Sequence, residues 1–173
     1  KLPDSTSSIG AALFSGCSNL TGIDIPDGVT TLGHGAFRGC SSLTSIIIPD
    51  GVTTIGDEAF CHCSNLTSIN IPFGVTTISK YTFSNCPSLK IIYVDSAEAA
   101  STDYIAEGFV RDTLTVYVNS NIKKVDSSIK SLPCVKKKIE YNGKTYTAYS
   151  KEHSLDNSSS SVCNVCGRTP GAS

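Results

Sequence analysis

The sequence lacks the features that mark several common classes of protein. No stretch approaches the roughly 18 consecutive apolar residues of a membrane-spanning helix, so we expect no membrane insertion. Metalloprotease, nucleophile-elbow and phosphate-binding glycine-loop motifs are absent, and the three histidines, His34, His62 and His153, occupy unrelated positions. These absences favour a protein that is not an enzyme and needs no cofactor.

A basic surface is also missing from the first two thirds of the chain. Residues 1–110 carry four Lys or Arg residues against ten Asp or Glu residues, whereas residues 111–173 carry ten against five. Nucleic-acid binding requires a positive surface to meet the phosphates. The acidic first part therefore argues against a nucleic-acid partner. The two parts of the chain also differ in the sign of their net charge.

What the chain does have is one pattern that recurs four times at a spacing of 23 residues, without insertion or deletion. Units 32–54 and 55–77 are identical at 15 of 23 positions. The recurring positions are Ile9, Leu32, Ile55 and Ile78; Phe14, Phe37, Phe60 and Phe83; Cys17, Cys40, Cys63 and Cys86; Leu20, Leu43, Leu66 and Leu89; Ile23, Ile46, Ile69 and Ile92; and Ile25, Ile48, Ile71 and Val94. Each unit is too short to enclose its own apolar residues, so the units must stack into a solenoid.

Within a unit, the end of the Leu-x-x-Ile-x-Ile segment alternates and is β-branched, which predicts a strand paired in parallel with the same segment of the neighbouring units. The proline that follows, as at Pro49, closes the strand because it has no N–H to donate. A glycine such as Gly51 then permits a turn. Residues 56–60, with alanine near the centre, suggest a single helical turn.

The units read Ile-Gly-x-x-Ala-Phe-x-x-Cys-x-x-Leu-x-x-Ile-x-Ile-Pro-x-x-Val, and this pattern resembles the BspA-like family of bacterial leucine-rich repeats from about residue 2 to residue 94. The resemblance implies a cell-surface or secreted protein of a host-associated microbe, and some family members act as adhesins. Leu2-Pro3-Asp4 repeats Ile25-Pro26-Asp27, so we expect the chain to begin partway through a unit and any export signal to lie upstream.

The expected fold is an α/β leucine-rich-repeat solenoid, a parallel β-sheet of stacked repeats with short helical turns, followed by a C-terminal cap with a helix and a β-hairpin. The solenoid covers residues 1–94, with a truncated repeat at 1–8 and four full repeats from residue 9. A capping region follows at 95–149, and a Ser-rich linker and Cys-x-x-Cys tail at 150–173.

Three elements are predicted within the capping region. Leu114 to Val118 resembles one more strand. A short amphipathic helix before Pro133 is predicted by the near-helical spacing of its apolar residues, Ile122, Val125, Ile129 and Leu132. Asn142-Gly143, flanked by 139–141 and 144–146, predicts a tight hairpin.

Four of the eight cysteines occupy one repeat position and should form a ladder of buried, inert thiols, because strand stacking suits disulfide geometry poorly. Cys163 and Cys166 form a Cys-x-x-Cys pair, and with His153 they are weak candidates for a zinc site. Residues 153–168 resemble short tail modules with a further cysteine where this chain has Ser159. Metal binding, a local disulfide and free thiols all stay open for this pair.

Between the inward-pointing strand residues lie residues that should line the concave face of the sheet. From these we select as candidate ligand-binding residues Asp24, Ile47, Asn70, Ile91 and Tyr93. One hypothesis is a monomeric surface or secreted binding module that contacts a host or microbial surface protein, extracellular matrix or a glycan. The other is a structural spacer in a longer surface protein, with no ligand of its own.

Overall fold

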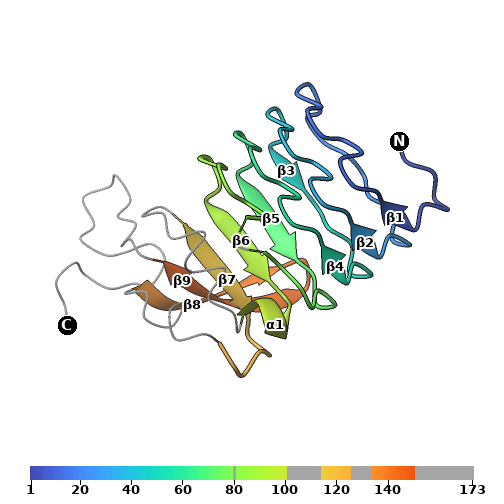
Figure 1. The fold of residues 1–173 in the computed structure, drawn as a ribbon. Coiled ribbons are helices and arrows are strands. Elements are labelled where there is room, and N and C mark those ends of the chain that lie inside the picture. Colours follow the sequence, from blue (N-terminus) through green and yellow to red (C-terminus); the bar gives the residue numbers. More distant parts are fainter. Residues whose placement is uncertain (80, 101–113, 126–133, 151–173) are drawn as a thin grey trace.

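A computed structural model describes residues 1–79, 81–100, 114–125 and 134–150. The repeats follow one another as parallel coils from the N-terminus to a β-hairpin at the other end (Figure 1). The elements are β1 (Ser8–Ile9), β2 (Thr31–Leu32), β3 (Ser45–Ile46), β4 (Thr54–Ile55), β5 (Ser68–Ile71), β6 (Ile91–Val94), α1 (Ala97–Ala100), β7 (Thr115–Asn119), β8 (Cys134–Tyr141) and β9 (Lys144–Ser150).

Two parallel ladders hold the repeats together. One is a three-stranded sheet in the order β1-β2-β4, and the other is the parallel part, β3-β5-β6-β7, of a six-stranded sheet in the order β3-β5-β6-β7-β9-β8. The last two strands, β9 and β8, are antiparallel. In the six-stranded sheet Ile46 pairs with Ile69 and Ile69 with Ile92, one repeat apart each time. The predicted parallel stacking is therefore confirmed for the second, third and fourth repeats, whereas residues 20–25 of the first repeat form no strand.

Hydroxyl groups add a third ladder between the repeats. The Thr53 hydroxyl donates to the Thr30 carbonyl at 3.3 Å, and the Thr76 hydroxyl donates to the Thr53 carbonyl at 3.5 Å. The Thr30 hydroxyl does the same to the Ser7 carbonyl at 3.3 Å. Each of these carbonyls also accepts the backbone N–H of the same threonine, so the recurring hydroxyl adds a second hydrogen bond to the preceding repeat.

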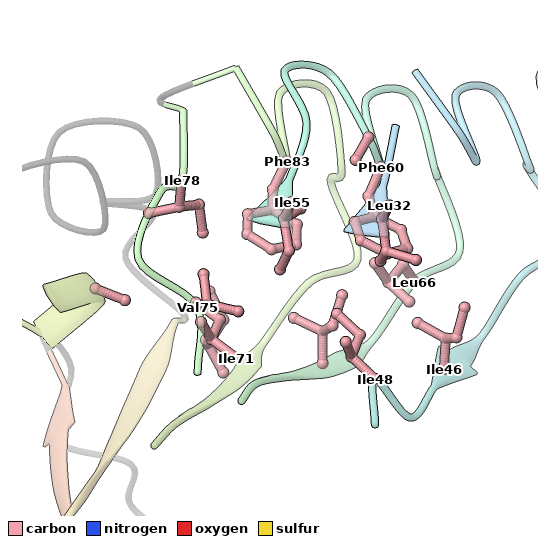
Figure 2. Close-up of a cluster of buried hydrophobic side chains, with 14 of the residues drawn as sticks. Leu32, Ile46, Ile48, Ile55, Phe60, Leu66, Ile71, Val75, Ile78 and Phe83 are labelled. Atoms are coloured by element: carbon pink, nitrogen blue, oxygen red, sulfur yellow. The ribbon is translucent and has the colours of Figure 1, made fainter. Parts of the chain in front are cut away.

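The core lies between the two sheets. Figure 2 shows Phe60 and Phe83 entering it from one side and Ile46 and Ile71 from the other. The phenylalanine rings form a continuous stack, with centroid distances of 5.3 Å between Phe14 and Phe37, 5.4 Å for the next pair and 5.7 Å for the last. Phe37 and Phe60 therefore have equivalent surroundings, as a solenoid requires, whereas Phe14 at the end of the stack is only half-buried.

The cysteine ladder joins neighbouring repeats through weak hydrogen bonds. The thiols of Cys40 and Cys63 each donate to a phenylalanine carbonyl of the preceding repeat, at 3.2 Å in both cases. Burial raises the pKa of the Cys40 thiol to about 11 and that of Cys63 further still. The prediction of buried thiols is confirmed for Cys40, Cys63 and Cys86, but it is wrong for Cys17, which is exposed because no described repeat covers it.

The predicted helical turn at 56–60 is wrong. Although the Ala59 N–H bonds to the Gly56 carbonyl, the Phe60 N–H donates to Thr82 of the next repeat at 2.9 Å. Glu58 also adopts a left-handed conformation, with φ of 55°, which interrupts a right-handed helix. The segment forms successive turns because its hydrogen bonds join adjacent repeats.

The same segment explains why glycine follows the first apolar residue in the second and third repeats, at Gly33 and Gly56. A Cβ added at Gly56 would lie 2.5 Å from the His34 backbone nitrogen, and one at Gly33 would lie 2.6 Å from that of Ala11. The backbones of adjacent repeats approach too closely for any side chain at these positions.

The predicted C-terminal helix is not found in the part of it that is described. After β7 the Ile122 N–H donates to the Asn119 carbonyl at 2.9 Å, which forms a turn, and residues 122–125 are not helical. Residues 126–132 of that prediction lie outside the described residues. Among the described residues the only helix is the four-residue α1, whose first turn is capped by the Ser96 hydroxyl accepting from the Ala99 N–H at 3.0 Å.

The other cap predictions are confirmed. The expected strand at 114–118 is β7, which extends the parallel ladder beyond β6. The expected hairpin is β8–β9, longer than predicted, with its turn at Asn142 (φ of 48°) and Gly143 (φ of 71°), the two positive values that a tight hairpin turn requires. None of the helices described here has the length and apolar character needed to span a membrane.

Candidate functional site

The exposed face of the six-stranded sheet carries two adjoining hollows, which we call the trough. The first, of about 450 Å³, lies between β3, β5, β6 and the hairpin, and the second, of about 420 Å³, lies over the first two repeats. Both hollows are lined by Asp27, Ser45, Ile46, Ile47 and Pro49. Because they share these walls, they form one depression that crosses the repeats from Asp24 to the hairpin.

Strand alternation decides which side chains reach the trough. Ile46 and Ile69 point into the core, so the residues after them, Ile47 and Asn70, point outward. Asn70 pairs in register with Tyr93, which continues the row onto β6. Ile47 is 66% exposed, which makes it the main apolar surface of this row.

The candidate residues named from the sequence play different parts in this structure. Asp24 and Ile47 are exposed and line the trough. Asn70 also lines it, but its amide accepts from the Ile48 N–H at 2.8 Å and donates to the Ile48 carbonyl at 2.7 Å. Asn70 therefore extends the pairing of β5 with the chain after β3. Ile91 is half-buried and belongs to the neighbouring row.

Tyr93 lies in a cluster of tyrosines at the hairpin end of the trough. Its ring stacks on Tyr141, with centroids 4.0 Å apart and planes at 5°, and on Tyr117 at 5.2 Å. Tyr146 meets it edge-on at 5.4 Å. In the sheet order β8 is separated from β6 by two strands, so this contact requires the sheet to curl until the hairpin returns over β6.

A buried carboxylate fixes the hairpin in this position. Asp95, 7% exposed, accepts from the Asn119 amide at 2.8 Å, the Lys144 ammonium at 3.0 Å and the Tyr146 hydroxyl at 3.1 Å. Lys144 also lies 3.4 Å from Asp50. Burial and the charge of Asp95 raise the pKa of Tyr146. For Lys144 burial lowers the pKa, but Asp95 and Asp50 outweigh it and the net shift is upward.

Sequence reasoning missed these hairpin residues as part of the site. The Asn-Gly turn indicated that a hairpin exists but not where it docks. Asp95 was a signal that could have been used, since it stands where other repeats have Pro26, Pro49 and Pro72. A carboxylate in place of a recurring proline suggests a specific partner, and here the partner is the hairpin.

No cluster of three or more potential metal ligands occurs within the described portion of the chain. The zinc candidates Cys163, Cys166 and His153 lie outside the described residues.

Solved structures similar to this chain come from bacteria. A leucine-rich cell surface protein from Faecalibacterium prausnitzii matches with 31% identity and a TM-score of 0.53, over 56% of this chain and 26% of that one. The pneumococcal vaccine antigen PcpA matches with 26% identity and a TM-score of 0.58, over 72% and 29% respectively. A leucine-rich repeat protein from Eubacterium ventriosum matches with 28% identity and a TM-score of 0.50, over 67% and 31%.

The chain thus spans less than a third of the length of each of these three proteins. No curated protein matches it. The family model described as BspA type leucine rich repeat region matches residues 1–107 in six copies. This match agrees with the stacked 23-residue repeats and the phenylalanine ladder. The chain belongs to the BspA-type leucine-rich-repeat family.

Proposed function

We propose that this chain is a non-catalytic binding module of a bacterial surface or secreted protein and holds a protein or glycan partner in the trough. The observation that carries the proposal is the trough itself, in which Ile47 stands 66% exposed on a sheet whose other face is fully packed. The description of the Faecalibacterium protein as a cell surface protein supports the location. No cofactor is part of the proposal.

Physical reasoning favours binding at such a surface. The strands are held by two ladders and a packed core, so their side chains lose little conformational freedom when a partner docks. An apolar anchor within a polar rim is also the usual anatomy of a protein interface. Ile47 is the anchor, and Asp24, Asp27 and Asp50 form the rim.

The test is the substitution Ile47→Asp, which places a charge in the middle of the trough. The matched control is Leu13→Asp, because Leu13 is 54% exposed and does not line the trough. Binding of the chain to immobilised mucin, fibronectin and collagen would be measured by surface plasmon resonance, with circular dichroism to verify folding. We expect Ile47→Asp to weaken binding at least tenfold and Leu13→Asp to leave it within twofold.

The alternative, a spacer without a ligand, predicts a different result. If folded Ile47→Asp bound every ligand of the wild-type chain with unchanged affinity, the trough would not be the binding surface. If the wild-type chain bound none of a broad panel of host proteins and glycans, the spacer hypothesis would replace the proposal.

A further inference from the structure

The trough carries an unbalanced charge. Among its lining residues are four carboxylates, Asp24, Asp27, Asp50 and Asp95, and one ammonium group, that of Lys144. Asp95 is engaged by Asn119 of β7 and by Lys144 and Tyr146 of the hairpin, and Asp50 shares Lys144 with it. The ion pairs between described residues include neither Asp24 nor Asp27, so the part of the trough farthest from the hairpin is negative.

These carboxylates share the wall of the trough with apolar side chains. Ile46, Ile47 and Pro49 line the same hollow as Asp27 and Asp50. Asp27 and Asp50 occupy the same position of successive repeats, which parallel stacking places about 4.8 Å apart along the backbone. The surface therefore offers negative charge and exposed apolar area side by side.

The hairpin already shows how this face holds an amine. Lys144 inserts its ammonium group between Asp50 and Asp95 and lies at the end of the trough beside Tyr141. The Lys144 side chain remains one third exposed, although the Asp95 carboxylate that it meets is buried. The same kind of group from a partner would meet Asp24 and Asp27 one or two repeats away.

We propose that the trough binds an extended segment of a partner protein in which lysine or arginine side chains flank an apolar residue. The cationic groups would pair with Asp24, Asp27 and Asp50, and the apolar residue would cover Ile47. These residues belong to two successive repeats, whose equivalent segments lie about 4.8 Å apart, a distance that an extended chain crosses in about two residues. This inference rests on the proposed function and narrows its ligand class.

Charge complementarity favours a basic peptide over a glycan. A neutral sugar has no group to neutralise Asp24 and Asp27, and a sialylated or sulfated sugar would be repelled by them. The aromatic ring best placed to receive a sugar, Tyr141, already has one face covered by Tyr93 at 4.0 Å. Glycan binding is therefore the outcome that the test must distinguish.

The experiment uses the full chain and a fluorescein-labelled octapeptide of alternating lysine and valine, with fluorescence anisotropy as the readout. The comparison peptide has glutamate in place of lysine, and neutral and sialylated mucin glycans form a third arm. We expect the lysine peptide to bind at least tenfold more tightly than the glutamate peptide. Raising the salt concentration from 50 to 500 mM should weaken its binding further, because exposed charges are screened.

Two double variants locate the effect. Asp24→Asn with Asp27→Asn should weaken lysine-peptide binding about tenfold and reduce its salt dependence. Asp4→Asn with Asp57→Asn removes the same charge from residues that do not line the trough and should leave binding within twofold. This control excludes an effect of net charge alone.

The results of these binding measurements distinguish an error in the proposed ligand class from an error in the proposed function. Failure of the lysine peptide to bind, equal binding of the glutamate peptide, or unchanged binding by the Asp24/Asp27 double variant would overturn it. If a glycan bound and Ile47→Asp abolished that binding, the proposed function would stand and only the ligand class would be wrong. If no ligand depended on Ile47, the proposed function would fail as well.

Discussion

The two ends of the solenoid carry the same repeat pattern in different surroundings. At the N-terminal end Phe14 is half-buried, Cys17 is exposed and Leu13 is 54% exposed. At the other end β7 and the hairpin cover the last repeat, and Ile92 and Val94 are fully buried. Burial in this molecule is therefore a property of neighbouring units in contact and not of the 23-residue unit alone.

The two ends also differ in what closes them. In the described chain β1 pairs only with β2, whereas β6 pairs with both β5 and β7. The cap then adds a buried carboxylate and a tyrosine cluster that no repeat contains. If this comparison is correct, equivalent substitutions at the two ends should have unequal effects on the free energy of unfolding.

The largest difference is expected for the phenylalanine ladder. Phe60→Ala removes a ring that is 0% exposed and stacked on both sides, and should cost about 4 kcal/mol. Phe14→Ala removes a half-buried ring stacked only on Phe37 among the described residues, and should cost about 1 to 2 kcal/mol. Urea unfolding monitored by circular dichroism measures both. Equal losses of unfolding free energy would show that the N-terminal repeat is as well packed as the middle repeats.

Asp95→Ala tests the end of the solenoid that β7 and the hairpin cover. It leaves the Tyr146 hydroxyl and Asn119 amide without their acceptor and Lys144 with Asp50 alone, so we expect a loss of about 2 to 3 kcal/mol. Asp27→Ala, an exposed carboxylate of the first repeat, should change stability by less than about 0.5 kcal/mol. Hydrogen exchange of β9 amides provides a local readout. Unchanged protection of β9 in Asp95→Ala would mean that the hairpin does not depend on this contact.

Glycines at one repeat position provide a third pair of equivalent substitutions. Gly56→Ala would place a Cβ 2.5 Å from the His34 backbone nitrogen, and separating the two repeats should cost about 2 kcal/mol. Around Gly10 nothing lies within 4 Å of the added atom, so Gly10→Ala should be neutral or stabilise by about 0.5 kcal/mol. Thermal unfolding of the pair measures the difference. A destabilised Gly10→Ala would contradict the open surroundings of Gly10.

The same contrast explains how much the sequence could predict. Stacking, register and the phenylalanine ladder were predictable because each position recurs, so one inference applies to every unit. The turn at 56–60 was mistaken for a helix because Ala59 and its neighbours suit one locally, whereas the Phe60 N–H bonds across to Thr82. The local helix propensity of these residues is outweighed by a hydrogen bond to a residue 22 positions away in the chain.

The cap was predictable only in part, for the opposite reason. The Asn142-Gly143 turn is a local signal, and the hairpin was found from it. Its docking depends on contacts such as Tyr93 with Tyr141 and Asp95 with Lys144, which join residues about fifty positions apart and occur once. No repetition reveals such pairs, and therefore Tyr93 was selected as an open binding residue although it lies in the tyrosine cluster.

The smallest expected effect separates the two kinds of contact that hold the hairpin. Tyr141→Ala removes the ring stacked on Tyr93 at 4.0 Å, but Tyr141 is 37% exposed, so the loss should be about 1 kcal/mol, below that of Asp95→Ala. Leu13→Ala, an exposed apolar residue at the open end, should cost less than about 0.5 kcal/mol. Urea unfolding measures both, and the near-ultraviolet circular dichroism of the tyrosines reports the stack directly. A loss in Tyr141→Ala as large as that in Asp95→Ala would mean that stacking contributes as much as the carboxylate to holding the hairpin over the trough.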